Sequence, residues 1–281
     1  MAEYRSKVLL GGLTFSEGPR WHEGRLWFSD MWRNRVMTVD EAGNAETIVE
    51  VPGRPSGLGW LPDGTLLVVS MQDRRLLRLG EGGLEEVADL SSIATWHTND
   101  MVVDAQGRAY IGNFGFDLLA GGDPVPAKLA LVTPDGAVRV AAEDLLFPNG
   151  TVITPDGSTL IIAETYGRRL TAFDIAEDGS LSGRRVFAEL DVLPDGICLD
   201  AEGAVWVSHP RAPECVRVLE GGEVTDRVAT EHHTYACMLG GADGRTLFIC
   251  SADGGEADRV AGRSAAYIET VRVAVPHAGL P

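Results

Sequence analysis

The stretch TPDGSTLIIAET, which runs from Thr154 to Thr165, is one of six similar stretches in this chain. Each stretch joins a short turn, in which Gly follows an acidic or amide residue, to a run of apolar residues. The turns are Glu23-Gly24, Asp63-Gly64, Gln106-Gly107, Asp156-Gly157, Glu202-Gly203 and Asp243-Gly244. Such pairs supply the positive φ that tight hairpins need, and β-branched and aromatic residues favour strands. Each stretch therefore predicts a β-hairpin.

The hairpins recur at an interval that is typical of a β-propeller. Matching turn glycines lie about 40 to 50 residues apart, and a third and often a fourth apolar run follow each hairpin. Six such units predict an all-β, six-bladed β-propeller with four-stranded antiparallel blades, in which residues 1–281 form a single domain. A β-sandwich pair of domains is the alternative, but six matched turns suit radial repetition better.

A propeller has to close, because its first and last blades otherwise expose sheet edges. The extended segment from Tyr4 to Leu10 precedes the first full unit. We expect this segment to pair with the last blade, which contains YIETVRVAV at residues 267–275.

The composition limits the partners that this protein can have. With 24 basic and 41 acidic residues, the net charge is −17, which argues against binding to nucleic acid or to anionic membranes. We see no signal sequence and no apolar run of the ~20 residues that a spanning helix needs. The four cysteines, at 198, 215, 237 and 250, lie in apolar runs without metal or redox spacing, so we expect buried free thiols. These features predict a cytoplasmic protein, a monomer or a small homo-oligomer, that binds a small molecule.

One position of the repeat carries oxygen donors. Counting back seven residues from the polar turn residue, or six in the shorter first unit, reaches the start of each blade's first strand, which lines the channel of a propeller. The residues there are Glu17, Ser56, Asn99, Asn149, Asp195 and Ala236. Asn and Asp are also common in turns. Four carboxylate or carboxamide donors at one ring position nevertheless favour a divalent cation, best matched by Ca²⁺, that acts as a Lewis acid.

Four segments around these donors resemble the gluconolactonase, senescence marker protein and luciferin-regenerating enzyme family. They are SEGPRWHEGRLWFSD, NDMVVDAQGRAYIGN, PNGTVITPDGSTLIIAET and PDGICLDAEGAVWVSH. The resemblance runs from about Glu17 to Ser251 and implies lactone hydrolysis at one metal, which is Ca²⁺, Zn²⁺, Mg²⁺, Mn²⁺ or Fe²⁺ according to the member. It implies that Glu17, Asn149 and Asp195 bind the metal. It also implies that Asn99 contacts substrate beside the metal, or is itself a ligand as in the phosphotriesterase branch.

The sequence departs from this family at the substrate pocket. Sugar-lactone members commonly carry Arg two residues before the Asn of the ND segment, where this chain has His97. Loops that follow the second strand of each blade should share the face of the donors, and they are rich in aromatic residues. We expect the substrate to contact Trp32, Trp96, His97, Phe114, Phe116, Tyr166 and His209. Any of these can instead pack between blades, but as a set they predict an apolar or aromatic substrate.

The chemistry predicted from these residues is metal-dependent opening of a lactone. Asp195 would activate the attacking water, or attack the carbonyl itself, and Asn99 would orient the carbonyl. His97 and His209 are further candidates for proton transfer. The chain lacks a G-x-S-x-G motif, which argues against a serine hydrolase. Two alternatives stay open: phosphotriester hydrolysis at the same metal, and a propeller that binds ligands without catalysis.

Overall fold

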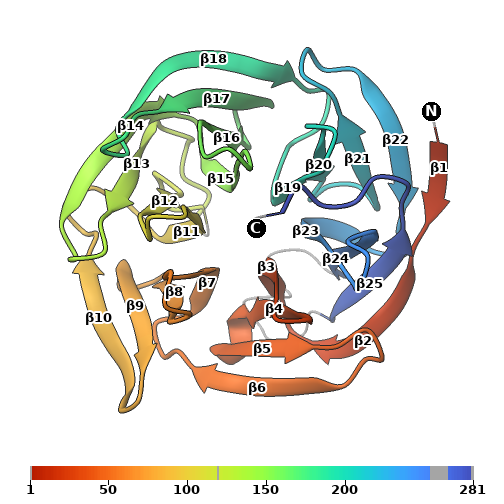
Figure 1. The fold of residues 1–281 in the computed structure, drawn as a ribbon, viewed down its shortest axis with the longest axis horizontal. Helices are drawn as coiled ribbons and strands as arrows, with labels where there is room; N and C mark the ends of the chain where they lie inside the picture. Colours follow the sequence, from red (N-terminus) through yellow and green to blue (C-terminus); the bar gives the residue numbers. More distant parts are fainter. Residues whose placement is uncertain (1, 119, 254–264, 280–281) are drawn as a thin grey trace.

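Six sheets surround a central channel in the computed structural model, which describes residues 2–118, 120–253 and 265–279 (Figure 1). Each sheet contains four antiparallel strands, and one sheet gains a fifth strand. The strands run in chain order from the channel outward, except that the outermost strand of the last blade is β2 from the N-terminal segment. The helical content of the described residues is one 3₁₀ turn, η1 (Met31–Arg33). The predicted six-bladed all-β propeller is therefore confirmed.

The blades follow one another along the chain. Blade one contains β3 (Ser16–His22), β4 (Arg25–Asp30), β5 (Arg35–Val39) and β6 (Ala45–Glu50), and blade two contains β7 (Pro55–Trp60), β8 (Leu66–Ser70), β9 (Arg75–Gly80) and β10 (Gly83–Asp89). Blade three contains β11 (Thr98–Val103), β12 (Ala109–Asn113), β13 (Ala127–Val132) and β14 (Val138–Leu145), and blade four contains β15 (Pro148–Ile153), β16 (Thr159–Glu164), β17 (Arg169–Ile175) and β18 (Leu181–Glu189). Blade five contains β19 (Ile197–Leu199), β20 (Val205–Ser208), β21 (Glu214–Val218) and β22 (Val224–Ala229). Blade six contains β23 (His233–Gly240), β24 (Thr246–Ala252) and β25 (Ala266–Arg272).

The predicted hairpin turns connect the first and second strands of the blades. Gly157 and Gly203 have φ values of 72° and 79°, in the region that L side chains rarely adopt. The apolar second strands then face the neighbouring blades. In β8 and β16, for example, Val68 and Ile162 are fully buried. The core thus lies between blades, and the channel is left for polar side chains.

The N-terminal segment closes the ring by joining two blades. β2 (Lys7–Leu13) pairs antiparallel with β25 as the outermost strand of blade six, with Lys7 opposite Thr270. β1 (Ala2–Arg5) instead pairs in parallel with β22 of blade five, with Tyr4 opposite Val228. The predicted pairing with the last blade is therefore confirmed for β2. It is wrong for the residues before Ser6, because the chain crosses from one blade to the next at that residue.

Two further predictions concern single features. All four cysteines are free and buried, as expected, and the sulfur atoms of Cys198 and Cys237 lie 3.8 Å apart. Burial raises the pKa of the Cys215, Cys237 and Cys250 thiols well above the usual value, so these thiols stay protonated. In the described ranges of the chain, no helix is long and apolar enough to cross a membrane.

Candidate functional site

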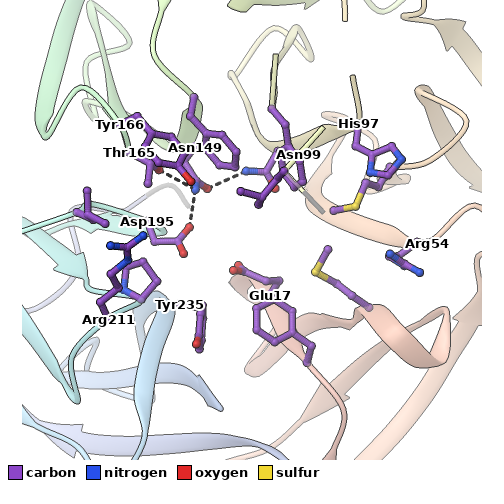
Figure 2. A pocket seen from close by; sticks show the side chains of 18 of the residues that line it. Glu17, Arg54, His97, Asn99, Asn149, Thr165, Tyr166, Asp195, Arg211 and Tyr235 are labelled. Atoms are coloured by element: carbon purple, nitrogen blue, oxygen red, sulfur yellow. Dashed lines mark hydrogen bonds between the residues drawn. The ribbon is translucent and has the colours of Figure 1, made fainter. Parts of the chain in front are cut away.

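Side chains from the innermost segments of four blades meet in one cavity of about 260 Å³. Glu17, Asn99 and Asn149 are the second residues of β3, β11 and β15, and Asp195 lies two residues before β19. All four side chains point into the cavity (Figure 2). The repeat position counted from the turns therefore corresponds to a cluster of oxygen-bearing groups in space.

Glycines beside the donors let the inner strands approach one another closely. A Cβ atom on Gly57 would lie 2.4 Å from the backbone nitrogen of Met101, in the next blade. A Cβ atom on Gly150 would lie 2.5 Å from the backbone nitrogen of Ile197. Side chains cannot occupy these spaces without moving the neighbouring backbone. The absence of a side chain at these positions therefore determines how closely the donors gather.

A chain of side-chain hydrogen bonds connects the donors and ends at a carboxylate. Ser56 Oγ donates to Asn99 Oδ1 at 3.3 Å, and Asn99 Nδ2 donates to Asn149 Oδ1 at 2.9 Å. Asn149 Nδ2 then donates to Asp195 Oδ1 at 2.5 Å and to Thr165 Oγ1 at 3.1 Å (Figure 2). The buried amides thus hold one another in fixed orientations, with a positive dipole end directed at Asp195.

The donor set fits a hard divalent cation. No group of three His, Cys, Asp or Glu side chains suited to a metal occurs within residues 2–118, 120–253 and 265–279. A cation at this site would therefore combine the carboxylates of Glu17 and Asp195 with carboxamide oxygens, which is a ligand type that Ca²⁺ accepts. Asn149 directs its NH₂ group at the carboxylate of Asp195. A bound cation would balance the negative charge of that carboxylate in place of the NH₂ group. Rotating the amide by half a turn would present its oxygen instead, and the two orientations have the same shape.

The rim of the cavity is largely apolar and aromatic, as the sequence predicted. Of the seven expected substrate residues, four line the cavity: Trp32, His97, Phe114 and Tyr166. Phe114 stacks on Phe147, with ring centroids 4.7 Å apart, and Phe147 meets Tyr166 edge to face at 5.5 Å. Trp32, Phe114 and Tyr166 lie in loops that follow the second strands of their blades, on the expected face, whereas His97 directly precedes the first strand of blade three.

The other three expected substrate residues are not among those that line the cavity. Phe116 is buried against Phe147 and Tyr166, with centroids 5.9 and 5.6 Å away, because the long loop after β12 folds back on itself. Trp96 stacks on His97 at 5.1 Å, so it supports a wall residue. His209 accepts a hydrogen bond from the backbone nitrogen of Arg211, and it is Arg211 that reaches the cavity. The structure therefore places these three beside lining residues and not among them.

A second repeat position, which was not predicted as such from the sequence, supplies a third of the lining residues other than the donors. The residues two positions before the donors all line the cavity, in five successive blades: Phe15, Arg54, His97, Phe147 and Leu193. In blade six, the register of β23 shifts between Thr234 and Ala236, and Tyr235 lines the cavity instead. Arg54 can be located from the sequence by counting two residues further back than the donor position of blade two. Other unpredicted lining residues are Met71, Thr165, Pro210 and Arg211.

Burial controls the charge of the polar groups on the rim. Burial lowers the pKa of His97, and the nearby Arg54 cation lowers it further, against a smaller opposing effect of Asp117. Burial likewise lowers the pKa of His209. Both imidazoles are therefore neutral at neutral pH. Burial also lowers the pKa of Arg54, but a guanidinium keeps its charge in proteins.

Comparison with known proteins places this geometry in a family. The model of the SMP-30/gluconolactonase/LRE-like region matches residues 15–253. Regucalcin from Danio rerio is 29% identical over 251 residues, which cover 84% of this chain and 82% of the relative. The 6-deoxy-6-sulfogluconolactonase of Pseudomonas putida is 26% identical over 246 residues, with the same two coverages.

The solved structure of a luciferin-regenerating enzyme shares the fold, with a TM-score of 0.81 at 20% identity and 97% of each chain covered. The family match includes all four strands of blades one to four, β19 to β22 of blade five, β23 and β24 of blade six, and all four donor residues. The chain therefore belongs to the SMP-30/gluconolactonase/LRE-like family.

Proposed function

We propose that this protein is a metal-dependent hydrolase that opens a lactone in the cavity of the propeller channel. The observation that carries the proposal is the convergence of Glu17, Asn99, Asn149 and Asp195 in one apolar-rimmed cavity. Relatives named for lactone hydrolysis support it, among them the 6-deoxy-6-sulfogluconolactonase and a putative sugar lactone lactonase of Bacillus subtilis. A structural neighbour is described as a calcium-binding regucalcin, which at 22% identity shows only the fold.

Glu17, Asn149 and Asp195 would hold the cation, with Asn99 beside them as a fourth ligand or as a substrate contact. Oxygen donors of this kind suit Ca²⁺ best, and Mg²⁺, Mn²⁺, Fe²⁺ or Zn²⁺ are alternatives. When bound, the cation supplies a Lewis acid that polarises the lactone carbonyl.

The protein side chains provide the proton transfer and the alignment. Asp195 accepts a proton from the attacking water as the water oxygen bonds to the carbonyl carbon. The ring C–O bond then breaks, and the proton passes from Asp195 to the departing alkoxide, which gives a hydroxy acid. Asn99, held between Ser56 and Asn149, orients the carbonyl. Direct attack by Asp195 on the carbonyl is the variant of this scheme, and it would give a covalent acyl-enzyme.

The rim favours an apolar or aromatic lactone over a polyhydroxylated one. Burying one face of an aromatic substrate against residues such as Trp32 and Phe114 would contribute roughly 1.5–3 kcal/mol of binding. Each sugar hydroxyl left unpaired against those rings would cost about 1–3 kcal/mol. We therefore expect kcat/KM for an aromatic or alkyl-substituted lactone to exceed that for gluconolactone by at least about tenfold. Equal or reversed preference would show that these rings do not select the substrate.

The experiment measures metal content and hydrolysis in the same preparations. Purified protein is analysed for bound metal and assayed by pH indicator against an aliphatic lactone, an aromatic lactone and a phosphotriester. Glu17→Gln and Asp195→Asn should both lose metal and lactonase activity. The control Asp156→Asn removes an exposed carboxylate in the turn at the other end of β15, and it should keep both.

Three outcomes would overturn the proposal. Full metal occupancy and activity in both cavity variants would show that the cavity does not hold the metal. Faster hydrolysis of the phosphotriester than of either lactone would identify the phosphotriesterase alternative. Bound metal without hydrolysis of any of the three would favour a binding protein.

A further inference from the structure

Arg54 is held at the rim of the cavity in a specific orientation. It lies between β6 and β7 with a φ of 71°, and its backbone nitrogen and oxygen bond to Val51 and Met71. Its guanidinium lies over the ring of Trp32, 3.7 Å from the centroid. Figure 2 shows Arg54 next to His97, apart from the group formed by Glu17, Asn99, Asn149 and Asp195. The cation is thus placed at one end of the cavity and the hydrolytic donors at the other.

The charge of Arg54 is not balanced by a neighbouring carboxylate in the described part of the chain. The three most buried arginines of the fold each have such a partner: Arg20 with Asp100 at 2.9 Å, Arg108 with Asp104 at 2.6 Å and Arg217 with Asp200 at 2.6 Å. Arg54 has none among the ion pairs of the described residues, and its Nε is buried without a hydrogen-bond partner. A buried donor that stays unpaired costs free energy.

A ligand that enters the cavity can supply the missing partner. The planar guanidinium presents a fork of donors that matches the two oxygens of a carboxylate, and the indole of Trp32 holds that plane in place. A neutral imidazole at His97, which also lines the cavity, can donate an additional hydrogen bond. The net charge of −17 repels anions from the protein as a whole, so a local cation is needed to admit one.

We propose that Arg54 and Trp32 form a subsite for an anionic substituent, a carboxylate, on the otherwise apolar lactone. This inference rests on the proposed lactonase function, and it names the class of lactone that the cavity selects. The carboxylate binds at Arg54 while the ring carbonyl lies among the donors at the other end. Because the subsite is remote from the reacting carbonyl, its effect falls on binding, and hence on KM more than on kcat.

The test compares two lactones that differ only in this charge. An aromatic lactone with a free carboxylate and its methyl ester are assayed with the wild type, Arg54→Gln, Arg54→Lys and Arg74→Gln. Arg74 is the matched control. It is also a half-buried arginine at positive φ in a loop of blade two, but it bonds to the carbonyl of Ala94 and does not line the cavity.

The measured quantity is the ratio of kcat/KM for the carboxylate to kcat/KM for the ester. We expect Arg54→Gln to lower this ratio at least about tenfold, through KM, with a smaller decrease in Arg54→Lys, which keeps the charge but lacks the planar fork. Arg74→Gln should leave the ratio as in the wild type. An unchanged ratio in Arg54→Gln, or an equal decrease in Arg74→Gln, would overturn the inference.

A binding measurement separates this inference from the proposed function. Benzoate, which cannot be hydrolysed, should raise the melting temperature of the wild type and of Arg74→Gln but not of Arg54→Gln. If the wild type hydrolyses neither lactone, the lactonase proposal fails, and the benzoate shift still decides whether Arg54 binds carboxylates. If benzoate stabilises the wild type and Arg54→Gln equally, the subsite does not exist.

Discussion

Replacing Ser6 by Ala tests the residue at which the N-terminal segment crosses between blades. Ser6 is 6% exposed, and its Oγ donates to Glu269 Oε2 at 2.5 Å. Glu269 is fully buried in β25 and also accepts hydrogen bonds from Ser251 Oγ at 2.6 Å and from the backbone nitrogen of Glu231 at 3.1 Å. His232 Nδ1 lies 3.1 Å from its other oxygen. Ser6 is thus the contact through which the first segment of the chain reaches a buried carboxylate of the last blade.

The expected loss follows from the charge of the acceptor. A hydrogen bond to a charged group contributes about 1.5–3 kcal/mol, and Ser6→Ala leaves one buried lone pair of Glu269 without its donor. For a protein of this size, that corresponds to a decrease in melting temperature of roughly 3–5 °C. Ser180→Ala is the control, because Ser180 Oγ donates to Asp178 at 2.9 Å on the exposed surface. Removing that hydroxyl should change the free energy of unfolding by no more than about 0.5 kcal/mol.

The loss of stability caused by Ser6→Ala should become smaller as the pH falls. Burial alone would raise the pKa of Glu269, but the hydrogen bonds from Ser251, Ser6 and Glu231, with that of His232, outweigh it and lower the pKa below 4.5. Among the described residues, the ion pairs around Glu269 are formed by His232, which lies 3.4 Å from Asp253 in turn. A carboxylate with a lowered folded pKa stabilises the protein above its unfolded pKa of about 4.3, and this contribution is lost as the pH falls through the folded pKa.

Thermal unfolding of both variants at pH 7 and near pH 3 provides the measurement. The difference between wild type and Ser6→Ala should be largest at pH 7 and should shrink in acid. If Ser6→Ala and Ser180→Ala lose the same stability, or if the deficit of Ser6→Ala is unchanged in acid, then Ser6 does not stabilise the closure through the charge of Glu269.

Three further predictions concern closure and the donor site. Deleting residues 1–10 removes β1 and half of β2 and exposes the edges of β22 and β25, so calorimetry should show a sharp decrease in melting temperature, and an unchanged value would contradict the closure. Gly150→Ala would place a Cβ 2.7 Å from the carbonyl oxygen of Asp195 and displace that donor, so titration calorimetry should show weaker divalent-metal binding. The control Gly157→Ala, in the exposed turn, should bind metal as the wild type does. Chelation should lower the melting temperature, and re-added metal should restore it in proportion to the logarithm of its concentration, because the cation binds only the folded ring.

The strand pattern could be predicted from the sequence because local chemistry determines it. The turn glycines and β-branched runs act within each hairpin, and the repeat interval then fixes the number of blades. The route of the N-terminus could not be predicted as fully. Residues 2–5 pair with β22 rather than β25, and the alternation of apolar and polar residues does not distinguish two neighbouring sheet edges. At the crossing point, Ser6 Oγ donates to Glu269, a contact between residues 263 positions apart that a local sequence pattern does not predict.

The walls of the cavity were predicted less completely than the donors for a similar reason. Trp96 and Phe116 belong to the correct loops, but their direction depends on the packing of His97 and Phe147, which composition does not reveal. Arg54 was predictable in principle, since it has the same offset from Ser56 that His97 has from Asn99. It was not predicted because Ser56, at the donor position of the same blade, is a poor ligand for a cation, and the predictions were built on the donors.

In the proposed function, three repeat positions at the channel would separate the catalytic chemistry from the selection of the substrate. One position presents the oxygen donors, and in four blades the next residue is a glycine that sets their spacing. The position two residues before the donors supplies wall groups as different as Phe15, Arg54 and Leu193. The wall position varies from apolar to cationic side chains, whereas the donor position keeps an oxygen-bearing side chain in five of the six blades. In the proposed lactonase, the same ring of oxygens would act on lactones of different polarity, and wall residues such as Arg54 in blade two and His97 in blade three would decide where a polar substituent binds.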